Sequence, residues 1–189
     1  LGELQKAERL HLEALDIYVS ISGESTLEVA KTLNNLGIVE RKLLKFTNSL
    51  GCFQRSLSIY ENIFGKQHKD YLKTISNYAN LLIEFQNYSE AELVLLNVIE
   101  EYHNSLDEFH LDYARVLNNL GVLYQTVGNH EKALIYIQKA LSIYREKLGN
   151  NNKDVANCLL NLGILYKDKG DLLQSYDCVI ETKSILTKL

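Results

Sequence analysis

Cysteine and histidine side chains are the groups with which this sequence could bind a metal or attack a substrate. Three cysteines are present, and they lie far apart, at Cys52, Cys158 and Cys178. An odd number of cysteines at such wide spacing fits neither a disulfide framework nor a zinc site. We therefore expect buried, reduced thiols on helices, where a free cysteine behaves as a small apolar side chain.

The five histidines do not indicate a catalytic or metal site either. His11, His103 and His130 have no histidine, cysteine or carboxylate partner at a spacing typical of metal ligands. His68 and His110 are 42 residues apart, and we expect each to cap or flank the start of a helix. The sequence contains no HExxH, GxSxG, phosphate-binding loop or dinucleotide motif. It therefore predicts a protein that is not an enzyme and has no cofactor and no metal.

The net charge narrows the classes of partner. The 189 residues carry a formal net charge of −4, whereas a nucleic-acid-binding protein usually has an excess of basic residues. No apolar run approaches the roughly 18 residues that a membrane-spanning helix needs. We therefore expect no nucleic-acid partner and no membrane insertion. The chain starts at Leu1 without a methionine, so we expect a fragment of a longer, cytoplasmic protein, and its oligomeric state is left open.

An internal repeat sets the elements around these residues. The segment LNNLG at 33–37 recurs at 117–121, and related segments occur at 75–79 and 159–163, so the period is 42 residues without an insertion. A second motif keeps the same register, with tyrosines at Tyr18, Tyr60, Tyr102 and Tyr144. Two motifs in one register establish a repeat, which is the signature of a stacked array. We expect the four tyrosines to be core residues between helices.

Each repeat is predicted to form two helices. In the third repeat, apolar residues between 117 and 127 follow steps of three and four, and Gly128 ends this helix. A second apolar face follows between 133 and 148 and ends at Gly149. Small residues at 37, 79, 121 and 163 are expected to let the two helices approach closely. Acidic residues that complement the helix dipole stand in the first turn of each first helix, at Glu28, Asp70, Asp112 and Asp154.

The third repeat resembles the tetratricopeptide repeat, whose pattern combines large apolar and small residues at fixed places. It has that pattern at Leu117, Leu120, Gly121, Tyr124, Gly128, Ala133, Ile137 and Ala140. The period of 42 and the segments LNNLG and ALSIY are similar to the kinesin-light-chain subclass. The first repeat departs from the pattern, with Glu40 at the tyrosine place and Leu44 at the glycine place.

This resemblance implies an all-α fold, a right-handed superhelical solenoid of antiparallel helix pairs. Residues 1–189 would form one array, in which 1–22 are the second helix of a partial repeat. Four repeats would follow, at 27–64, 69–106, 111–148 and 153–189. The last helix departs from the pattern at Thr182 and Lys183, which is expected either of a polar capping helix or of simple sequence drift.

In tetratricopeptide proteins the first helices line a concave groove, so the resemblance also implies which residues face a ligand. Those suited to peptide binding are Lys31, Asn35, Lys73, Asn77, Asn80, Arg115, Asn119 and Asn161. An asparagine amide can donate to and accept from a peptide backbone, and a basic stripe favours a ligand with carboxylates. The alternative is structural: the asparagines satisfy neighbouring helices, and the basic residues are ordinary solvated surface.

The predicted function is a non-catalytic scaffold or adaptor that binds an acidic, partly hydrophobic segment of a protein partner. The alternative is a regulatory or sensor domain of a larger protein, controlled by a ligand or by its own chain. RNA binding by helical repeats is disfavoured by the period of 42 and by the acidic charge.

Overall fold

The computed structural model describes residues 2–104 and 111–189, and all regular elements in these two ranges are α-helices. They are α1 (Gly2–Ser22), α2 (Leu27–Lys42), α3 (Phe46–Phe64), α4 (Lys69–Glu84), α5 (Tyr88–Asn104), α6 (Leu111–Thr126), α7 (His130–Leu148), α8 (Lys153–Asp168) and α9 (Leu172–Leu186). The predicted all-α class is confirmed. None of the described helices is both long and apolar enough to span a membrane. His110, expected to flank a helix start, lies outside the described residues.

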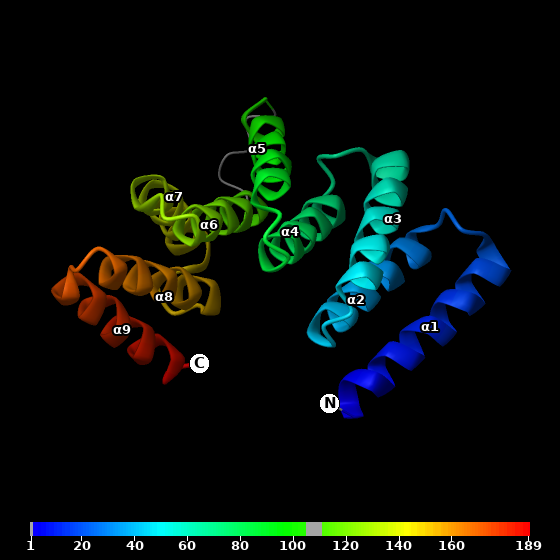
Figure 1. Cartoon of the computed structure of the whole chain (residues 1–189), viewed down its shortest axis with the longest axis horizontal. Coiled ribbons are helices and arrows are strands. Elements are labelled where there is room, and N and C mark those ends of the chain that lie inside the picture. Colours follow the sequence, from blue (N-terminus) through cyan, green and yellow to red (C-terminus); the bar gives the residue numbers. More distant parts are fainter. Residues whose placement is uncertain (1, 105–110) are drawn as a thin grey trace. The chain divides into compact units, whose positions relative to one another are not determined.

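The helices gather into two compact units, Leu1–Val94 and Leu95–Leu189. In the first unit, helices that follow each other in sequence pack together, α1 with α2, α2 with α3 and α3 with α4 (Figure 1). In the second unit the same holds for α6 with α7, α7 with α8 and α8 with α9. The first helices of successive pairs also touch, α2 with α4 and α6 with α8. This is the predicted stacking of helix pairs, whereas the exact division into four repeats of one array stays a prediction.

Side chains just before the first helices cap their free backbone N–H groups. His68 caps α4, because its Nδ1 accepts a hydrogen bond from the backbone N–H of Asp70 at 3.3 Å. Asn152 does the same for α8 by accepting from the N–H of Asp154 at 2.8 Å. Such caps satisfy donors that have no partner within the first turn. The predicted role of His68 is confirmed, as are the acidic first turns of α2, α4, α6 and α8.

Glycines bring the two helices close together in three pairs, α2–α3, α6–α7 and α8–α9, as predicted. A Cβ atom added to Gly37 would lie 2.9 Å from the ring of Phe53, and one added to Gly121 would lie 2.4 Å from Ile137. At Gly163 the nearest atom would be 3.3 Å away. The first two distances are shorter than van der Waals contact, so a side chain at either glycine would require its neighbours to shift.

The turns between paired helices adopt a left-handed backbone conformation with or without glycine. Gly128 and Gly170 have φ angles of 79° and 82° in the second unit. Leu44 and Gln86 take the equivalent positions in the first unit, with φ angles of 61° and 58°. A left-handed conformation is strained for a residue with a side chain, so the first unit contains strain that the second avoids.

Three of the four repeat tyrosines belong to the core. Tyr60, Tyr102 and Tyr144 are buried, whereas Tyr18 is 38% exposed, so the prediction for Tyr18 is wrong. Tyr18 lies on α1, whose neighbouring helix among the described residues is α2. Its outer side therefore stays open to solvent, while the equivalent tyrosines lie between two helices.

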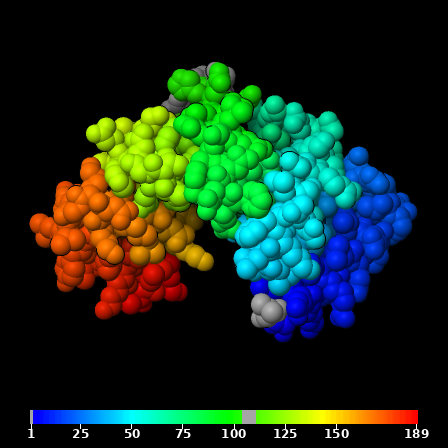
Figure 2. All heavy atoms as spheres, viewed as in Figure 1, coloured from blue at the N-terminus to red at the C-terminus, as the bar shows by residue number. Residues whose placement is uncertain are grey.

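The last helix, α9, is not a polar cap. Thr182, one of the residues that depart from the repeat pattern, is buried, and its hydroxyl donates to the backbone carbonyl of Cys178 at 2.8 Å. Large apolar side chains are exposed along α9 (orange to red in Figure 2), at Leu172, Leu173, Tyr176, Val179 and Ile180. The capping interpretation is therefore wrong, because a terminal cap requires a polar outer face.

Candidate functional site

Three of the predicted groove residues are accessible in the first unit. Lys31 and Asn35 are exposed on α2, and Lys73 is exposed on α4. Lys31 and Asn35 are four residues apart on one helix and therefore share a face. Lys73 is equivalent to Lys31 one repeat later. Neither lysine has an ion-pair partner among the described residues, so both charges are available to a ligand.

Two other predicted groove residues are tied to a neighbouring helix. The side chain of Asn77 on α4 donates from Nδ2 to Oδ1 of Asn34 on α2 at 3.0 Å. Asn161 on α8 donates in the same way to Asn118 on α6, also at 3.0 Å. We call each of these two hydrogen bonds an asparagine rung. Their geometry supports the structural alternative for these amides, and ligand binding by Asn77 and Asn161 stays a prediction.

In each unit, a second polar contact joins the same two first helices two turns further along, α2 to α4 and α6 to α8. The guanidinium of Arg41 pairs with the carboxylate of Glu84 at 2.8 Å, and Gln125 Nε2 donates to Asp168 at 3.2 Å. These contacts and both asparagine rungs join residues 43 positions apart. Neighbouring first helices are thus offset by one residue from the sequence period of 42. Sequence reasoning missed the acceptors of the two rungs because it compared only positions 42 apart; a search at 43 would have found them.

The remaining predicted groove residues differ in accessibility. Asn80 is half-buried on α4, and Asn119 is buried on α6. The guanidinium of Arg115 pairs with the carboxylate of Asp112 at 2.6 Å in the first turn of α6. Such a pair is partly exposed and screened, so it reduces the charge of Arg115 without abolishing it. The predicted basic stripe is therefore represented by free lysines in the first unit and by a paired arginine in the second.

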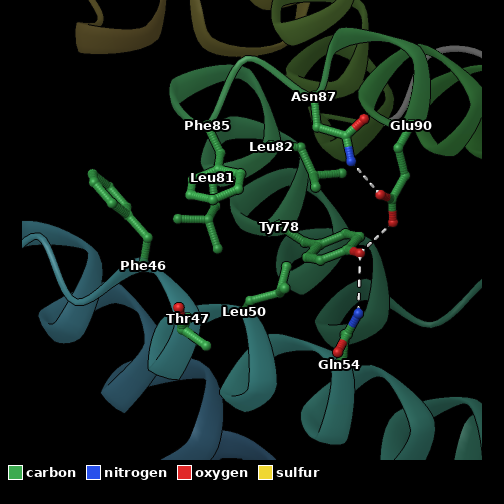
Figure 3. A pocket seen from close by; sticks show the side chains of 10 residues that line it. All are labelled: Phe46, Thr47, Leu50, Gln54, Tyr78, Leu81, Leu82, Phe85, Asn87 and Glu90. Atoms are coloured by element: carbon green, nitrogen blue, oxygen red, sulfur yellow. Dashed lines mark hydrogen bonds between the residues drawn. The ribbon is translucent and has the colours of Figure 1, made fainter.

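A pocket of about 120 Å³ opens in the first unit and shares no residue with this face (Figure 3). Helix α3 lines one side and α4 the other, and the residues that start α5 close one end. Phe46 is the first residue of α3 and Phe85 directly follows α4, and their ring centroids are 6.1 Å apart. Leu81 and Leu82 are buried, whereas Phe85 is 63% exposed. The pocket therefore has an apolar floor and an aromatic rim that is open to solvent.

Hydrogen-bonded polar side chains form the end of the pocket at the start of α5, away from the two phenylalanines (Figure 3). The hydroxyl of Tyr78 donates to Oε1 of Glu90 at 2.6 Å and accepts from Gln54 at 3.4 Å. Asn87 donates to Oε2 of Glu90 at 2.6 Å. Burial and the hydrogen bond to Glu90 raise the pKa of Tyr78 to about 12, so the phenol remains a donor at neutral pH. No lining residue is cationic, so both oxygens of Glu90 have neutral partners.

The cysteines are free thiols on helices, but only one is fully buried. Cys158 is buried, whereas Cys52 and Cys178 are half-buried, which corrects the prediction for these two. Burial raises the pKa of the Cys52 and Cys158 thiols to about 12. A thiol with this pKa is almost entirely protonated near pH 7 and is a poor nucleophile. In the described ranges, no group of three or more His, Cys, Asp or Glu side chains is placed to hold a metal ion.

Comparison with solved structures finds the same fold in several helical repeat proteins. BtubC (BKLC) from P. vanneervenii has a TM-score of 0.79 at 22% identity, over 99% of this chain and 74% of that one. A kinesin-light-chain protein with TPR-like repeats from Podosopora anserina has a TM-score of 0.75 at 14% identity, over 99% and 88%. A Rap protein complexed with Competence and Sporulation Factor has a TM-score of 0.70 at 20% identity, over 99% and 55%. At these identities the likeness shows a shared fold.

Sequence comparison is consistent with this fold. No curated protein matches the chain. The family profile described as the tetratricopeptide repeat matches residues 28–100, 76–146 and 112–175, which together cover 28–175 without a gap. The matched region includes every copy of the motif first seen at 33–37. The chain therefore belongs to the tetratricopeptide repeat family.

Proposed function

We propose that this chain is a non-catalytic interaction module that holds a segment of a protein partner along its first helices. Tetratricopeptide repeats generally serve protein–protein interaction rather than catalysis. One observation carries the proposal: α2 and α4 present Lys31 and Lys73 to solvent at equivalent places of successive repeats, and Asn35 is exposed on the same face as Lys31. Exposed polar groups that repeat in this way form an extended surface, which suits an extended ligand.

The proposed segment is acidic and partly hydrophobic. Lys31 and Lys73 attract carboxylates, because neither charge is neutralised by a described residue. Asn35 accepts a long hydrogen bond of 3.4 Å from Asn34, which leaves its own amide hydrogens for a peptide carbonyl. Half-buried Ile38 lies three residues further along the same helix and offers an apolar contact. In the second unit, Arg115 offers the corresponding charge.

The test starts with selection from a random peptide library on the immobilised chain, followed by affinity measurements with fluorescence polarisation. We expect selected peptides to be enriched in Asp, Glu and large apolar residues. The variant Lys31→Glu/Lys73→Glu should weaken their binding at least about tenfold, since it reverses two charges at the contact. Arg115→Glu, measured separately, tests the contribution of the second unit.

The matched control is Lys6→Glu/Lys188→Glu, which changes the net charge by the same amount. Both lysines are exposed and neither lies on a first helix, since Lys6 is on α1 and Lys188 follows α9. We expect this variant to bind the selected peptides like the native chain. Equal losses in the two double variants would show that overall charge drives binding, and selection of basic peptides would contradict the proposal.

A regulatory module is the second candidate, and one comparison favours it. The Rap protein of similar fold is complexed with Competence and Sporulation Factor, and this chain spans 55% of that protein's length. A sensor changes conformation when its ligand binds, whereas an adaptor keeps one conformation. Small-angle X-ray scattering with and without a saturating selected peptide distinguishes them: an unchanged radius of gyration favours the adaptor, and a changed one favours the sensor.

A further inference from the structure

The pocket between α3 and α4 has features that the proposed first-helix surface does not explain. Its floor is made by buried Leu81 and Leu82, yet the adjoining Phe85 ring is 63% exposed. An exposed aromatic ring beside an open apolar cavity loses water contacts when an apolar group fills the cavity. A cavity of about 150 Å³ holds a benzene ring, so a volume of about 120 Å³ suits one aliphatic side chain.

The polar end of the pocket adds a charge requirement. Glu90 accepts one hydrogen bond from the hydroxyl of Tyr78 and another from the amide of Asn87, each at 2.6 Å. Both donors are neutral, so they orient the carboxylate without cancelling its charge (Figure 3). A ligand cation beside this carboxylate gains a charge-assisted hydrogen bond. A carboxylate at the same place would instead be repelled.

The second unit shows that these features are specific to the first. Of the polar end, only Gln54 recurs 84 positions later, as Gln138, whereas Leu162 and Gln174 stand in place of Tyr78 and Glu90. The aromatic rim is replaced there as well, with His130 in place of Phe46 and Lys169 in place of Phe85. The second unit therefore lacks both the aromatic rim and the carboxylate that the pocket of the first unit combines.

We propose that the pocket of the first unit docks a partner segment in which an aliphatic side chain stands next to Lys or Arg. The aliphatic group enters the cavity beside the two phenylalanine rings, over Leu81 and Leu82, and the cation lies against Glu90. This goes beyond the proposed function, because the required charge is opposite to that of the segment bound by Lys31 and Lys73. It also does not depend on the proposed function, because the two surfaces have no residue in common.

The test uses three capped hexapeptides with a Gly-Ser flank on each side and a central Leu-Arg, Leu-Glu or Ser-Arg pair. Binding to the whole chain is followed by NMR, through the methyl signals of Leu50 and Leu81. We expect saturable shifts with the Leu-Arg peptide, an affinity at least fivefold lower for Leu-Glu, and no saturable shift with Ser-Arg. Equal affinities for Leu-Arg and Leu-Glu would overturn the charge requirement and with it the proposal.

Two variants locate the site, and a third is their control. Phe85→Ser removes an exposed ring and should lower the Leu-Arg affinity at least fivefold, whereas Lys169→Ser at the equivalent place in the second unit should leave it unchanged. Glu90→Gln keeps the size of the side chain and one acceptor oxygen but removes the charge, so it should abolish the preference for Leu-Arg over Leu-Glu. Circular dichroism confirms that each variant is folded. Unchanged binding by folded Phe85→Ser overturns the proposal.

Two further experiments test whether the peptide binds elsewhere and whether a second copy of the chain fills the pocket. Lys31→Glu/Lys73→Glu should bind the Leu-Arg peptide as the native chain does; a loss there, with Phe85→Ser unaffected, would place the peptide on the first helices and overturn the pocket. Sedimentation velocity tests a second copy as occupant. A concentration-dependent dimer that Phe85→Ser dissociates would show that the pocket is covered by self-association, which also overturns the proposal.

Discussion

The helix pairs α2–α3 and α6–α7 occupy equivalent places in the two units. Each pair crosses at a glycine, Gly37 or Gly121, but different side chains meet beside the two crossings. In the first pair, buried Glu40 accepts a hydrogen bond from the thiol of Cys52 at 3.3 Å. In the second, Tyr124 stacks on Tyr136 with ring centroids 5.6 Å apart, and the ammonium of Lys132 lies 4.7 Å from the Tyr124 ring. The same arrangement of two helices therefore accommodates either an acid–thiol pair or an aromatic pair at equivalent positions.

This difference indicates that the small residues at the crossing, rather than the larger groups beside it, define the helix pair. The hydroxyl of Ser49 adds a hydrogen bond of 2.7 Å to the carbonyl of Gly37 in the first pair. The second pair has Ala133 at the equivalent place, and its carbonyl oxygen would be 3.3 Å from a Cβ added to Gly121. The second crossing is thus the tighter one, and the stabilities of matched variants should show it.

The largest expected effect is at these crossings. Alanine at Gly121 would place its Cβ 2.4 Å from Cγ1 of Ile137 and 3.2 Å from that residue's backbone nitrogen. At Gly37 the nearest atoms belong to the Phe53 ring, and a ring edge shifts more readily than a backbone. Overpacking typically costs about 1–3 kcal/mol, and alanine regains about 1 kcal/mol of helix propensity. We expect urea unfolding to show a loss of about 2 kcal/mol for Gly121→Ala and less than about 0.5 kcal/mol for Gly37→Ala. Similar losses would show that the two crossings are equally tight.

The asparagine rungs should behave alike in the two units. Asn77→Ala and Asn161→Ala each remove the donor to an asparagine of the preceding first helix, so each should lose about 1 kcal/mol of stability. A double-mutant cycle of Asn34→Ala with Asn77→Ala should return a coupling of similar size. An alanine variant that keeps its stability but loses affinity for selected peptides would assign that asparagine to ligand binding instead.

The turns provide a smaller effect of opposite sign in the two units. Leu44 is exposed and has a φ of 61°, so Leu44→Gly should relieve backbone strain and gain about 0.5–1 kcal/mol. Gly128→Ala introduces the same strain at a φ of 79° and should lose about 1 kcal/mol. Thermal or urea unfolding of the two variants measures both changes. A destabilised Leu44→Gly would mean that the leucine side chain makes a contact worth more than the strain.

The smallest effect concerns Glu40 and depends on pH. Burial raises the pKa of this carboxyl above its ordinary value of 4.5, although hydrogen bonds from Cys52 and Asn48 oppose the shift. A carboxyl with a raised folded-state pKa stabilises the fold below its unfolded pKa and loses this contribution as the pH rises through the folded value. Glu40→Gln should therefore raise the melting temperature at pH 7 and lose this advantage as the pH falls towards 4.5. Glu61→Gln, an acid-to-amide change at an exposed position of α3, is the matched variant for comparison.

Two unusual residues of the first unit could be noticed in the sequence, but their structural roles could not be inferred from it. Glu40 and Leu44 stood out as departures from the repeat pattern. Only the packed helices show that the first is buried beside a thiol and that the second adopts a left-handed turn. The pocket gave no sequence signal, because its walls come from three helices and each contributes residues that are ordinary for its own apolar face.

The helices, their pairing and the family all follow from the amino-acid pattern. A period of 42 with internal steps of three and four specifies the apolar face of each helix, and in an array each repeat contacts mainly its neighbours. Which predicted groove residues remain available is visible only in the packed helices: Lys31 and Lys73 face solvent, whereas Asn77 joins a neighbouring helix. The offset of 43 between neighbouring first helices causes this difference, and it arises from side-chain packing across their whole contact. The periodicity of a single helix contains no information about that offset.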